Sequence, residues 1–423
     1  MSLRRSLLLS PAVVALCAAS FAQPLPMANQ PEDVGFSSER LTRIDRKFGA
    51  DVEQQKCPGA VLLIARKGKI AYFKAIGYQD RAANAPLKSD AIYRIASMTK
   101  PIVSVAAMTL AEEGSLDLEA PVSQYLPEFK DVQVGVEKAD HSGLSLEAPK
   151  RPMTVQDLLR HTSGLTYGLF GNSAVDKMYL SSGIFTAPTL AEMVKRIAKL
   201  PLAHQPGEVW EYSVSVDVLG RVLEAVTGKE LDQILAQRIT TPLRMSDTAF
   251  YVRDSQAGRL AKTDTGRQAA LSGDVTRRPS VLSGGGGLLS TAGDYARFCQ
   301  MMLNKGSLDG TRILSRKTVA LMTSDSLPPR TPRAPVAYVL GATGPTEEMG
   351  EGFGLGFAVR TAAGRNPLPG SVGDFHWAGI NGTYFWVDPK EDMLAVFMTQ
   401  VPREQIVPYW RLTRELVYQA LMD

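Results

Sequence analysis

Cysteine and histidine are scarce in this sequence, which excludes a disulfide framework and the common zinc sites. The 423 residues include 3 cysteines and 4 histidines. None of them lies in an H-E-x-x-H motif or in another Cys/His cluster with metal-ligand spacing. We therefore predict no metal and no cofactor. Whether Cys57 and Cys299 pair stays open, because sequence separation alone does not decide it.

A large excess of charge of one sign is also missing. Lysine and arginine number 47 against 43 aspartate and glutamate residues, which gives a net charge of +4. This near balance, together with the lack of a basic block, argues against an electrostatic nucleic-acid interface. We predict a small-molecule partner and no nucleic acid, and we leave the oligomeric state open.

Beyond the N-terminus, no apolar run is long enough to form a membrane helix. The N-terminus itself combines Arg4 and Arg5, an uncharged apolar run over Ser6–Ala19, and the small residues of Ser20-Phe21-Ala22. These three parts are typical of a secretory signal rather than of a buried helix. We predict cleavage after Ala22, a periplasmic or secreted location, and no integral membrane segment in the mature chain.

Both ends of the mature chain predict strands beside a helix. Ser37 is expected to cap the first helix, and apolar runs separated by turns predict hairpins at each end. The predicted strands are 60–65, 70–77, 383–387 and 393–399, and the predicted closing helix is 407–422. We therefore predict an α/β (α+β) fold, in which one antiparallel sheet from both chain ends is flanked by the terminal helices.

The middle of the chain predicts helices instead. Residues 102–111 are apolar on nearly every face, so this helix is expected to be buried on all sides. Further predicted elements are helices over 155–159, 190–200, 214–227 and 295–303 and a Pro- and Gly-rich loop over 328–352. We expect an α/β part at roughly 23–115 and 275–423 and a mainly helical part at roughly 116–274.

Two widespread motifs for hydrolysis and phosphate binding do not occur. No serine lies in a G-x-S-x-G elbow and no G-x-x-x-x-G-K-[ST] loop is present, although a Ser-His-Asp triad from distant segments stays open. The sequence does contain Ser97-Met98-Thr99-Lys100, an S-x-x-K tetrad at the start of the buried helix. Residues three apart share a helix face, so the Lys100 amine can reach the Ser97 hydroxyl. The helix N-terminus would also favour a developing oxyanion.

The segment Ile92–Lys100 resembles the active-site segment of the serine β-lactamase-like superfamily, and within it the family VIII carboxylesterases and the related class C β-lactamases. Other stretches resemble family segments in the same order: Pro31–Ser37, Leu158–Leu165, Pro206–Ser213, Gly285–Asp294 and Gly354–Phe357. The resemblance covers nearly all of residues 23–423. It implies one β-lactamase-like serine hydrolase domain, with the active site between an α/β part and a helical part.

The resemblance also implies roles for three residues. Ser97 would be the nucleophile that is acylated by substrate and freed by water, with Lys100 and Tyr212 transferring protons. Tyr212 begins Tyr212-Ser213-Val214, which stands in place of the family's Y-x-N motif. To act as a base, Lys100 must be neutral, although a free lysine is protonated at neutral pH. Whether Lys100 or Tyr212 is the base stays open, since a buried lysine and tyrosine titrate together.

The third motif of β-lactamases, K-T-G, does not occur in this chain. Trp377-Ala378-Gly379 stands in its place and is similar to the W-x-G-like triplet of family VIII esterases. By this correspondence, the oxyanion hole would consist of the backbone N–H groups of Ser97 and Ile380. Trp377 lacks the charge of the family lysine, and Val214 lacks the amide of the family asparagine. Both losses should weaken binding of an anionic amide by about a few kcal/mol and leave an apolar ester unaffected.

Two histidines and a glycine run are further candidates. His161, in H-T-S-G, is expected to be a structural hydrogen-bonding residue, and His376 an ordinary polar residue at a strand edge. Gly284–Gly287 has no following Lys-Ser/Thr, so we predict a close backbone approach behind the site rather than a phosphate loop. The candidate pocket walls are Tyr167, Phe170, Trp210 and Phe375.

Together, these observations predict a serine carboxylesterase that acts on short-chain or aryl esters, with weak β-lactam hydrolysis left open as a side activity. One alternative is a β-lactamase or a peptidase for D-amino-acid peptides, which would turn over cephalosporins or D-peptides better than simple esters. An alternative of another class is a non-catalytic sensor or binding protein, which would be acylated once at Ser97 or not at all.

Overall fold

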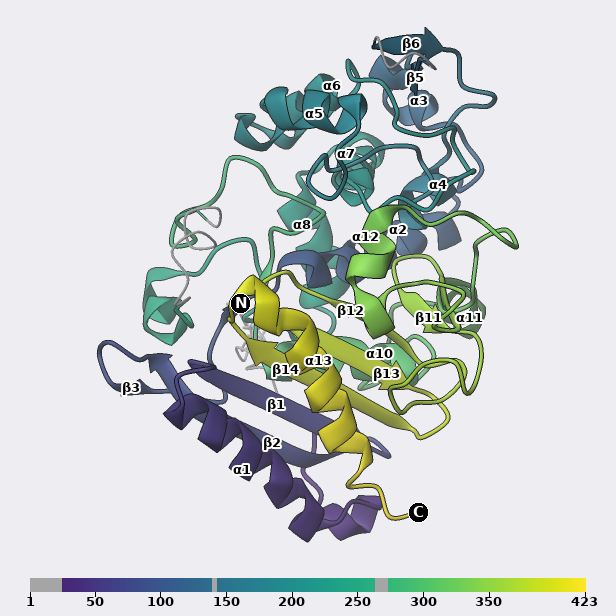
Figure 1. Ribbon diagram of the computed structural model, residues 1–423. Helices are drawn as coiled ribbons and strands as arrows, with labels where there is room; N and C mark the ends of the chain where they lie inside the picture. Colours follow the sequence, from purple (N-terminus) through teal and green to yellow (C-terminus); the bar gives the residue numbers. More distant parts are fainter. Residues whose placement is uncertain (1–24, 139–142, 263–272) are drawn as a thin grey trace, which may run out of the picture.

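One antiparallel sheet joins the two ends of the chain, as predicted (Figure 1). The computed structural model describes residues 25–138, 143–262 and 273–423, so the predicted signal segment 1–22 lies outside the described residues. The sheet has eight strands in the order β10-β11-β12-β13-β14-β1-β2-β3. Their bounds are β1 (Gly59–Arg66), β2 (Lys69–Asp80), β3 (Ala85–Pro86), β10 (Glu351–Phe353), β11 (Ala358–Arg360), β12 (Phe375–Ala378), β13 (Tyr384–Asp388) and β14 (Met393–Thr399).

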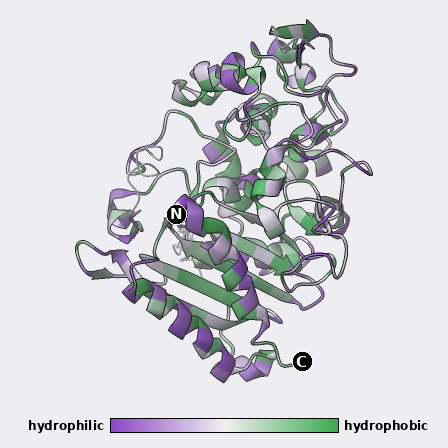
Figure 2. Cartoon of the chain, viewed as in Figure 1, coloured by the Kyte–Doolittle hydropathy of each residue, from purple (hydrophilic) through white to green (hydrophobic). Residues whose placement is uncertain are grey.

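The central strands β1 and β14 bring the two chain ends into register. Leu63 pairs with Val396, and every residue of both strands is buried. Their apolar runs are continuous because helices cover both faces of the sheet. α1 (Ser38–Glu53) and α13 (Arg403–Tyr418) lie on one face, and α10 (Ala292–Leu303) lies on the other. Figure 2 shows hydrophobic residues along these strands and hydrophilic residues on α1.

The terminal helices start at different kinds of signal. The Ser37 hydroxyl accepts a hydrogen bond from the Arg40 N–H at 3.2 Å and caps α1, as predicted. α13 begins at Arg403, four residues before the predicted start, and ends at Tyr418 rather than at Met422. Its first turn, Arg403-Glu404-Gln405, is polar, so the apolar pattern that predicts this helix begins only after the helix has started.

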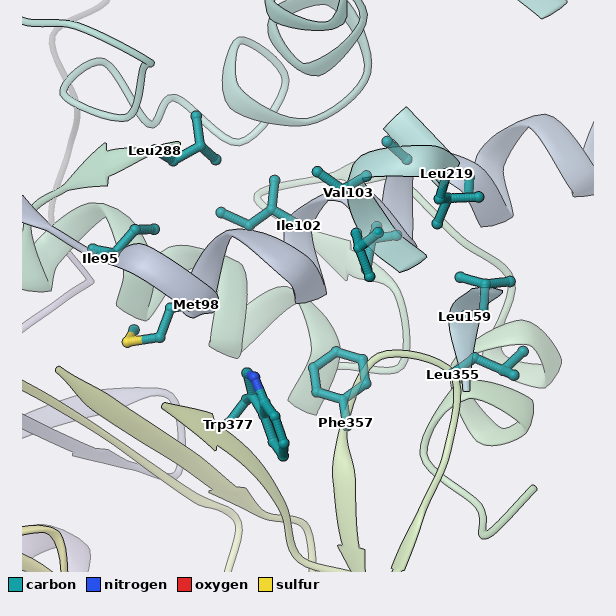
Figure 3. Packing of buried hydrophobic residues seen from close by; sticks show 14 of the residues in the cluster. Ile95, Met98, Ile102, Val103, Leu159, Leu219, Leu288, Leu355, Phe357 and Trp377 are labelled. Atoms are coloured by element: carbon teal, nitrogen blue, oxygen red, sulfur yellow. The ribbon is translucent and has the colours of Figure 1, made fainter. Parts of the chain in front are cut away.

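The buried helix α2 (Thr99–Glu112) lies at the centre of the molecule. All residues from Thr99 to Leu110 are buried, as predicted for 102–111. Figure 3 shows Met98, Ile102 and Val103 packed among apolar side chains from the sheet and from α7 (Ser215–Thr227). The other helices of four or more residues include α3 (Val122–Tyr125), α4 (Val155–Leu159), α5 (Ala174–Ser181), α6 (Leu190–Ile197), α8 (Leu231–Leu235), α11 (Arg316–Met322) and α12 (Pro335–Val339).

Three further predictions about the extent of elements are wrong. The predicted loop 328–352 contains α12 and the start of β10. Pro335 occupies the first position of α12, where the missing N–H of proline is not needed, so a residue that suggested a loop starts a helix. α10 begins at Ala292 rather than at Tyr295, because Thr291 caps it by accepting the Asp294 N–H at 3.1 Å. α6 ends at Ile197, three residues before the predicted end.

The structure answers the question about the cysteines. Cys57 and Cys299 are both buried free thiols, and they belong to the hydrophobic clusters on opposite faces of the sheet. They therefore do not pair with each other. Within the three described ranges, no helix has both the length and the apolar character that crossing a membrane requires.

Candidate active site

A tight turn before α2 presents Ser97 to a cavity. Ala96–Met98 form one 3₁₀ turn, which Ala96 enters with a positive φ of 43°. A residue with a side chain rarely adopts this conformation, and it persists only where surrounding contacts hold it. One such contact is the hydrogen bond that the Tyr295 hydroxyl donates to the Met98 carbonyl at 2.9 Å. Contacts of this kind therefore hold the strained turn and fix the position of Ser97, which the S-x-x-K tetrad predicts as the nucleophile.

The Lys100 amine lies against the Ser97 hydroxyl. Lys100 is in the first turn of α2, three residues after Ser97, and its Nζ donates to Ser97 Oγ at 3.2 Å. Nζ also donates to the Gly285 carbonyl at 2.5 Å, and the side chain is buried. The predicted helix geometry thus brings the pair together. A buried amine in this position can exchange a proton with the serine hydroxyl over a single hydrogen bond.

Tyr212 completes the group from a different segment of the chain. Its ring lies beneath Lys100, with Nζ 4.6 Å from the ring centroid. The Trp377 indole N–H donates to the Tyr212 oxygen at 3.4 Å, and the two rings are 5.3 Å apart. The segments that carry the S-x-x-K, Y-S-V and W-A-G motifs therefore meet at one place. Trp377, which replaces the lysine of K-T-G, acts on the tyrosine through a hydrogen bond rather than through a charge.

His161 supports the segment that carries Tyr212. Its Nδ1 accepts the Ser213 backbone N–H at 3.3 Å, and its ring centroid is 4.9 Å from that of Tyr212. Burial and the positive charge of Lys100 hold the pKa of His161 well below its ordinary value. The ring is therefore neutral and acts as an acceptor, which agrees with the predicted hydrogen-bonding role.

His376 is not at a strand edge, contrary to prediction. It lies inside β12, opposite Ala358 of β11 and Trp386 of β13. Its side chain is buried, and Nε2 lies 3.6 Å from a Glu351 carboxylate oxygen. Strand β11 was not predicted. The strand that carries His376 was therefore expected at the edge of the sheet, whereas β11 pairs with it there.

Asp217 is a site residue that the sequence analysis missed. One of its carboxylate oxygens accepts the Ser283 hydroxyl at 2.6 Å and the Gly285 N–H at 3.0 Å. Because the Gly285 carbonyl in turn accepts Lys100 Nζ, Asp217 positions the lysine through a single residue, Gly285. Burial raises the pKa of the Asp217 carboxyl, while the Ser283 hydrogen bond and the Lys100 charge act in the opposite direction. An acid in the first turn of the helix after Tyr212 is the signal that could have found it.

Gly285 has no room for a side chain. A Cβ at this position would lie 2.4 Å from an Asp217 carboxylate oxygen and 2.9 Å from the Tyr167 hydroxyl. The glycine run therefore allows a close backbone approach behind the site, as predicted, and the residue approached is Asp217.

We expect Asp217→Ala to lower kcat for ester hydrolysis by about 10- to 100-fold, because the backbone of Gly285 and hence Lys100 would lose their support. Asp217→Asn keeps an oxygen that can accept both hydrogen bonds, so its loss should be at most about 5-fold. Steady-state kinetics of both variants, with Asp131→Asn at an exposed position as the control, would measure this. Full activity of Asp217→Ala would show that Asp217 does not position the lysine.

The three motifs meet at a cavity of about 960 Å³. Ser97, Tyr212, Trp377 and Ile380 line it. Tyr167 and Phe170, both predicted walls, line it as well. Leu169, Ile184, Phe185, Val336 and Val339 add to its apolar surface. A cavity of this size and character can enclose an apolar acyl or aryl group.

Two predicted wall residues, Trp210 and Phe375, and two residues of the predicted motifs, Val214 and Gly379, lie behind the cavity wall instead. Val214 precedes α7 and is fully buried, so it does not occupy the position of a substrate-binding amide. Trp210 stacks on Tyr212, and Phe375 packs against Phe357. Gly379 is also absent from the residues that line the cavity. Sequence spacing could not give these orientations, because they depend on which face each segment turns to the core.

Gly379 instead brings the turn between β12 and β13 against the serine segment. A Cβ on Gly379 would lie 2.4 Å from the Ile95 carbonyl oxygen, so only glycine allows this approach. The Thr383 hydroxyl donates to the same carbonyl at 3.3 Å. The following residue, Ile380, is partly exposed and lines the same cavity as Ser97. The two residues with the predicted oxyanion-hole N–H groups thus face one space.

No group of three or more His, Cys, Asp and Glu side chains that could hold a metal ion occurs among the residues that the structure describes.

Residues 44–418 match the protein-family model described as Beta-lactamase. The chain is 31% identical over 402 residues to esterase EstB of Burkholderia gladioli, covering 89% of this chain and 94% of EstB. It is 30% identical over 375 residues to lovastatin esterase of Penicillium rubens, covering 84% and 91%. Among solved structures, it is similar to EstCE1, a hydrolase with promiscuous acyltransferase activity, with a TM-score of 0.72, 26% identity and coverage of 90% and 99%. Simvastatin synthase (LovD) of Aspergillus terreus shares the fold, with a TM-score of 0.75 at 23% identity, covering 90% and 98%.

Proposed function

We propose that this chain, which belongs to the beta-lactamase family and is a serine ester hydrolase, is a carboxylesterase for short-chain or aryl esters. It would act through Ser97. The observation that carries this proposal is the 3.2 Å hydrogen bond between Lys100 Nζ and Ser97 Oγ beside an apolar cavity. The proposed exported location, periplasmic or secreted, rests on the signal-like N-terminus.

In the first half of the reaction, Ser97 Oγ attacks the ester carbonyl carbon while its proton passes to the Lys100 amine, which accepts a proton only when it has lost its own. The carbonyl oxygen becomes an oxyanion that accepts the backbone N–H groups of Ser97 and Ile380. When the tetrahedral intermediate collapses, the bond to the alcohol oxygen breaks. The alcohol leaves with a proton supplied by the Lys100–Tyr212 pair, and the acyl group stays on Ser97.

In the second half, a water molecule attacks the acyl carbonyl and loses a proton to the same pair. The second tetrahedral intermediate collapses by breaking the bond to Ser97 Oγ, which regains a proton as the carboxylic acid leaves. Tyr212 can take part because it lies beneath Lys100 and its oxygen accepts the Trp377 N–H.

The preference for an ester over a β-lactam follows from the residue that replaces the family lysine. Trp377 contributes an indole N–H, which is already bonded to Tyr212, and no positive charge at the position of the family lysine. An aryl or short acyl group needs only the apolar walls formed by Tyr167 and Phe170.

We expect the wild-type protein to hydrolyse p-nitrophenyl butyrate with a kcat/KM at least about 100-fold above that for a chromogenic cephalosporin, because the charge of the family lysine is missing at position 377 and its loss weakens binding of the β-lactam transition state by about 3 kcal/mol. Side-by-side initial rates at equal enzyme concentration would measure this ratio. A higher rate on the cephalosporin would favour the β-lactamase alternative. Intact-mass spectrometry after ester addition provides the second readout, since a lasting adduct without turnover would favour a sensor.

A further inference from the structure

An arginine of the cavity wall has no partner in the described part of the chain. Arg94 is the second residue of β4 (Tyr93–Arg94), which pairs with β7 (Leu289–Ser290), and it lies three residues before Ser97. Its side chain lines the same cavity as Ser97 and Tyr212. Within the described ranges, its Nε is buried and forms no hydrogen bond, and its guanidinium forms no ion pair. Among the described residues, the cavity wall therefore presents a positive charge and a hydrogen-bond donor that no carboxylate contacts.

Arg94 is half-buried, whereas the fully buried arginines of the described ranges are paired with carboxylates. Arg414 contacts Asp374, and Arg360 lies 3.3 Å from the same side chain. Arg66 forms an ion pair with Glu391 at 3.2 Å. This contrast matters because a partly desolvated guanidinium without a partner is costly, and proteins normally provide a carboxylate for it. An unpaired arginine in an active-site cavity indicates that a ligand supplies the missing anion.

The described carboxylate whose charge acts on Arg94 does not bond to it. Burial lowers the pKa of Arg94 somewhat, and the negative charge of Asp274 acts in the opposite direction. Asp274 lines the same cavity but stays beyond ion-pair distance, and its carboxylate is bonded instead to Thr276 at 2.6 Å. Arginine does not lose its proton in proteins, so its charge is present whenever substrate binds.

We propose that Arg94 binds a carboxylate of the substrate, so that the preferred substrates are esters that carry a carboxylate on the group lying next to Arg94. The inference rests on the proposed esterase function and names a specificity-determining residue for it. A carboxylate can pair with two N–H groups of the guanidinium, including the free Nε–H. The apolar remainder of the ester fits the rest of the cavity, where Leu169, Phe170 and Phe185 lie.

The test compares matched esters with and without a carboxylate. For the alcohol side, the pair is 4-carboxyphenyl butyrate and the neutral 4-carbamoylphenyl butyrate. For the acyl side, it is the mono-p-nitrophenyl ester of adipic acid and p-nitrophenyl hexanoate. We expect wild type to favour the carboxylate member of at least one pair by about 10-fold or more in kcat/KM. Arg94→Gln should lower that ratio by at least about 10-fold, whereas Arg403→Gln, which removes an exposed arginine of the same cavity, should change it by less than about 2-fold.

The ratio separates this proposal from the esterase proposal, because general damage to catalysis cancels in it. Wild type that hydrolyses the neutral esters without preferring either carboxylate would overturn the role of Arg94 and leave the esterase function intact. The same conclusion follows if Arg94→Gln keeps the preference. If Arg94→Gln does not fold, Asp274→Asn decides the question: removing the competing charge should raise the ratio by about 2- to 5-fold, and an unchanged ratio would overturn the proposal.

Discussion

Ser97→Ala is expected to lower kcat on p-nitrophenyl butyrate by at least about 10⁴-fold, because no acyl-enzyme can form without the hydroxyl. The substitution removes one oxygen from a position that faces the cavity, and the turn that holds it depends on backbone contacts such as the bond from Tyr295 to the Met98 carbonyl. We therefore expect the variant to fold with an unchanged melting temperature. Initial rates and thermal unfolding of the same preparations would measure both quantities.

Ser104→Ala is the matched control for this experiment. Ser104 lies on the same helix, is fully buried, and its hydroxyl has no hydrogen-bond partner among the described residues. Removing that hydroxyl should leave ester hydrolysis within about 2-fold of wild type. Intact-mass spectrometry with a slowly released acyl group should detect an adduct on the control and none on Ser97→Ala. Retained hydrolysis by Ser97→Ala would instead mean that another nucleophile acts, such as a serine of a distant Ser-His-Asp triad.

The parts of the fold that the sequence predicts correctly depend on signals within a few residues. The Ser37 cap, the hairpin of β1 and β2 and the fully apolar helix α2 are all of this kind. The predicted contact between Ser97 and Lys100 belongs with them, since three residues of helix determine it. The resemblance supplies the segment of Tyr212, whose proximity to α2 no local pattern could have given.

What the sequence did not predict depends on long-range contacts. Asp217 acts on Lys100 through the backbone N–H and carbonyl of Gly285, and these three positions are far apart along the chain. Val214 and Trp210 belong to segments that the resemblance places correctly, yet both side chains turn into the core and not into the cavity. Whether the Arg94 guanidinium has a partner depends on the residues packed around it. Its lack of a partner among the described residues is therefore visible only in the folded chain.

The second large effect is expected at Lys100. Replacing Lys100 with methionine should lower kcat on p-nitrophenyl butyrate by about 10³-fold or more, because the Ser97 proton would lose its acceptor. Methionine has nearly the same length and is apolar, so it suits a position that is buried from solvent. Lys100→Arg keeps the positive charge but cannot act as a base, since a guanidinium stays protonated. Steady-state kinetics of the two variants would therefore separate the charge of Lys100 from its basicity.

We expect Lys100→Arg to be nearly as inactive as Lys100→Met, because the Lys100 amine is the group that contacts Ser97 Oγ directly. Tyr212→Phe should be less severe, at about 10- to 100-fold, since it removes a hydroxyl and keeps the ring beneath the lysine. The opposite order, with Tyr212→Phe inactive and Lys100→Arg retaining substantial turnover, would assign the base to Tyr212 and the supporting charge to residue 100. Lys100 and Tyr212 form one coupled pair, and either of them could take the serine proton. The ranking of the three variants by remaining activity therefore identifies which of the two residues is the base.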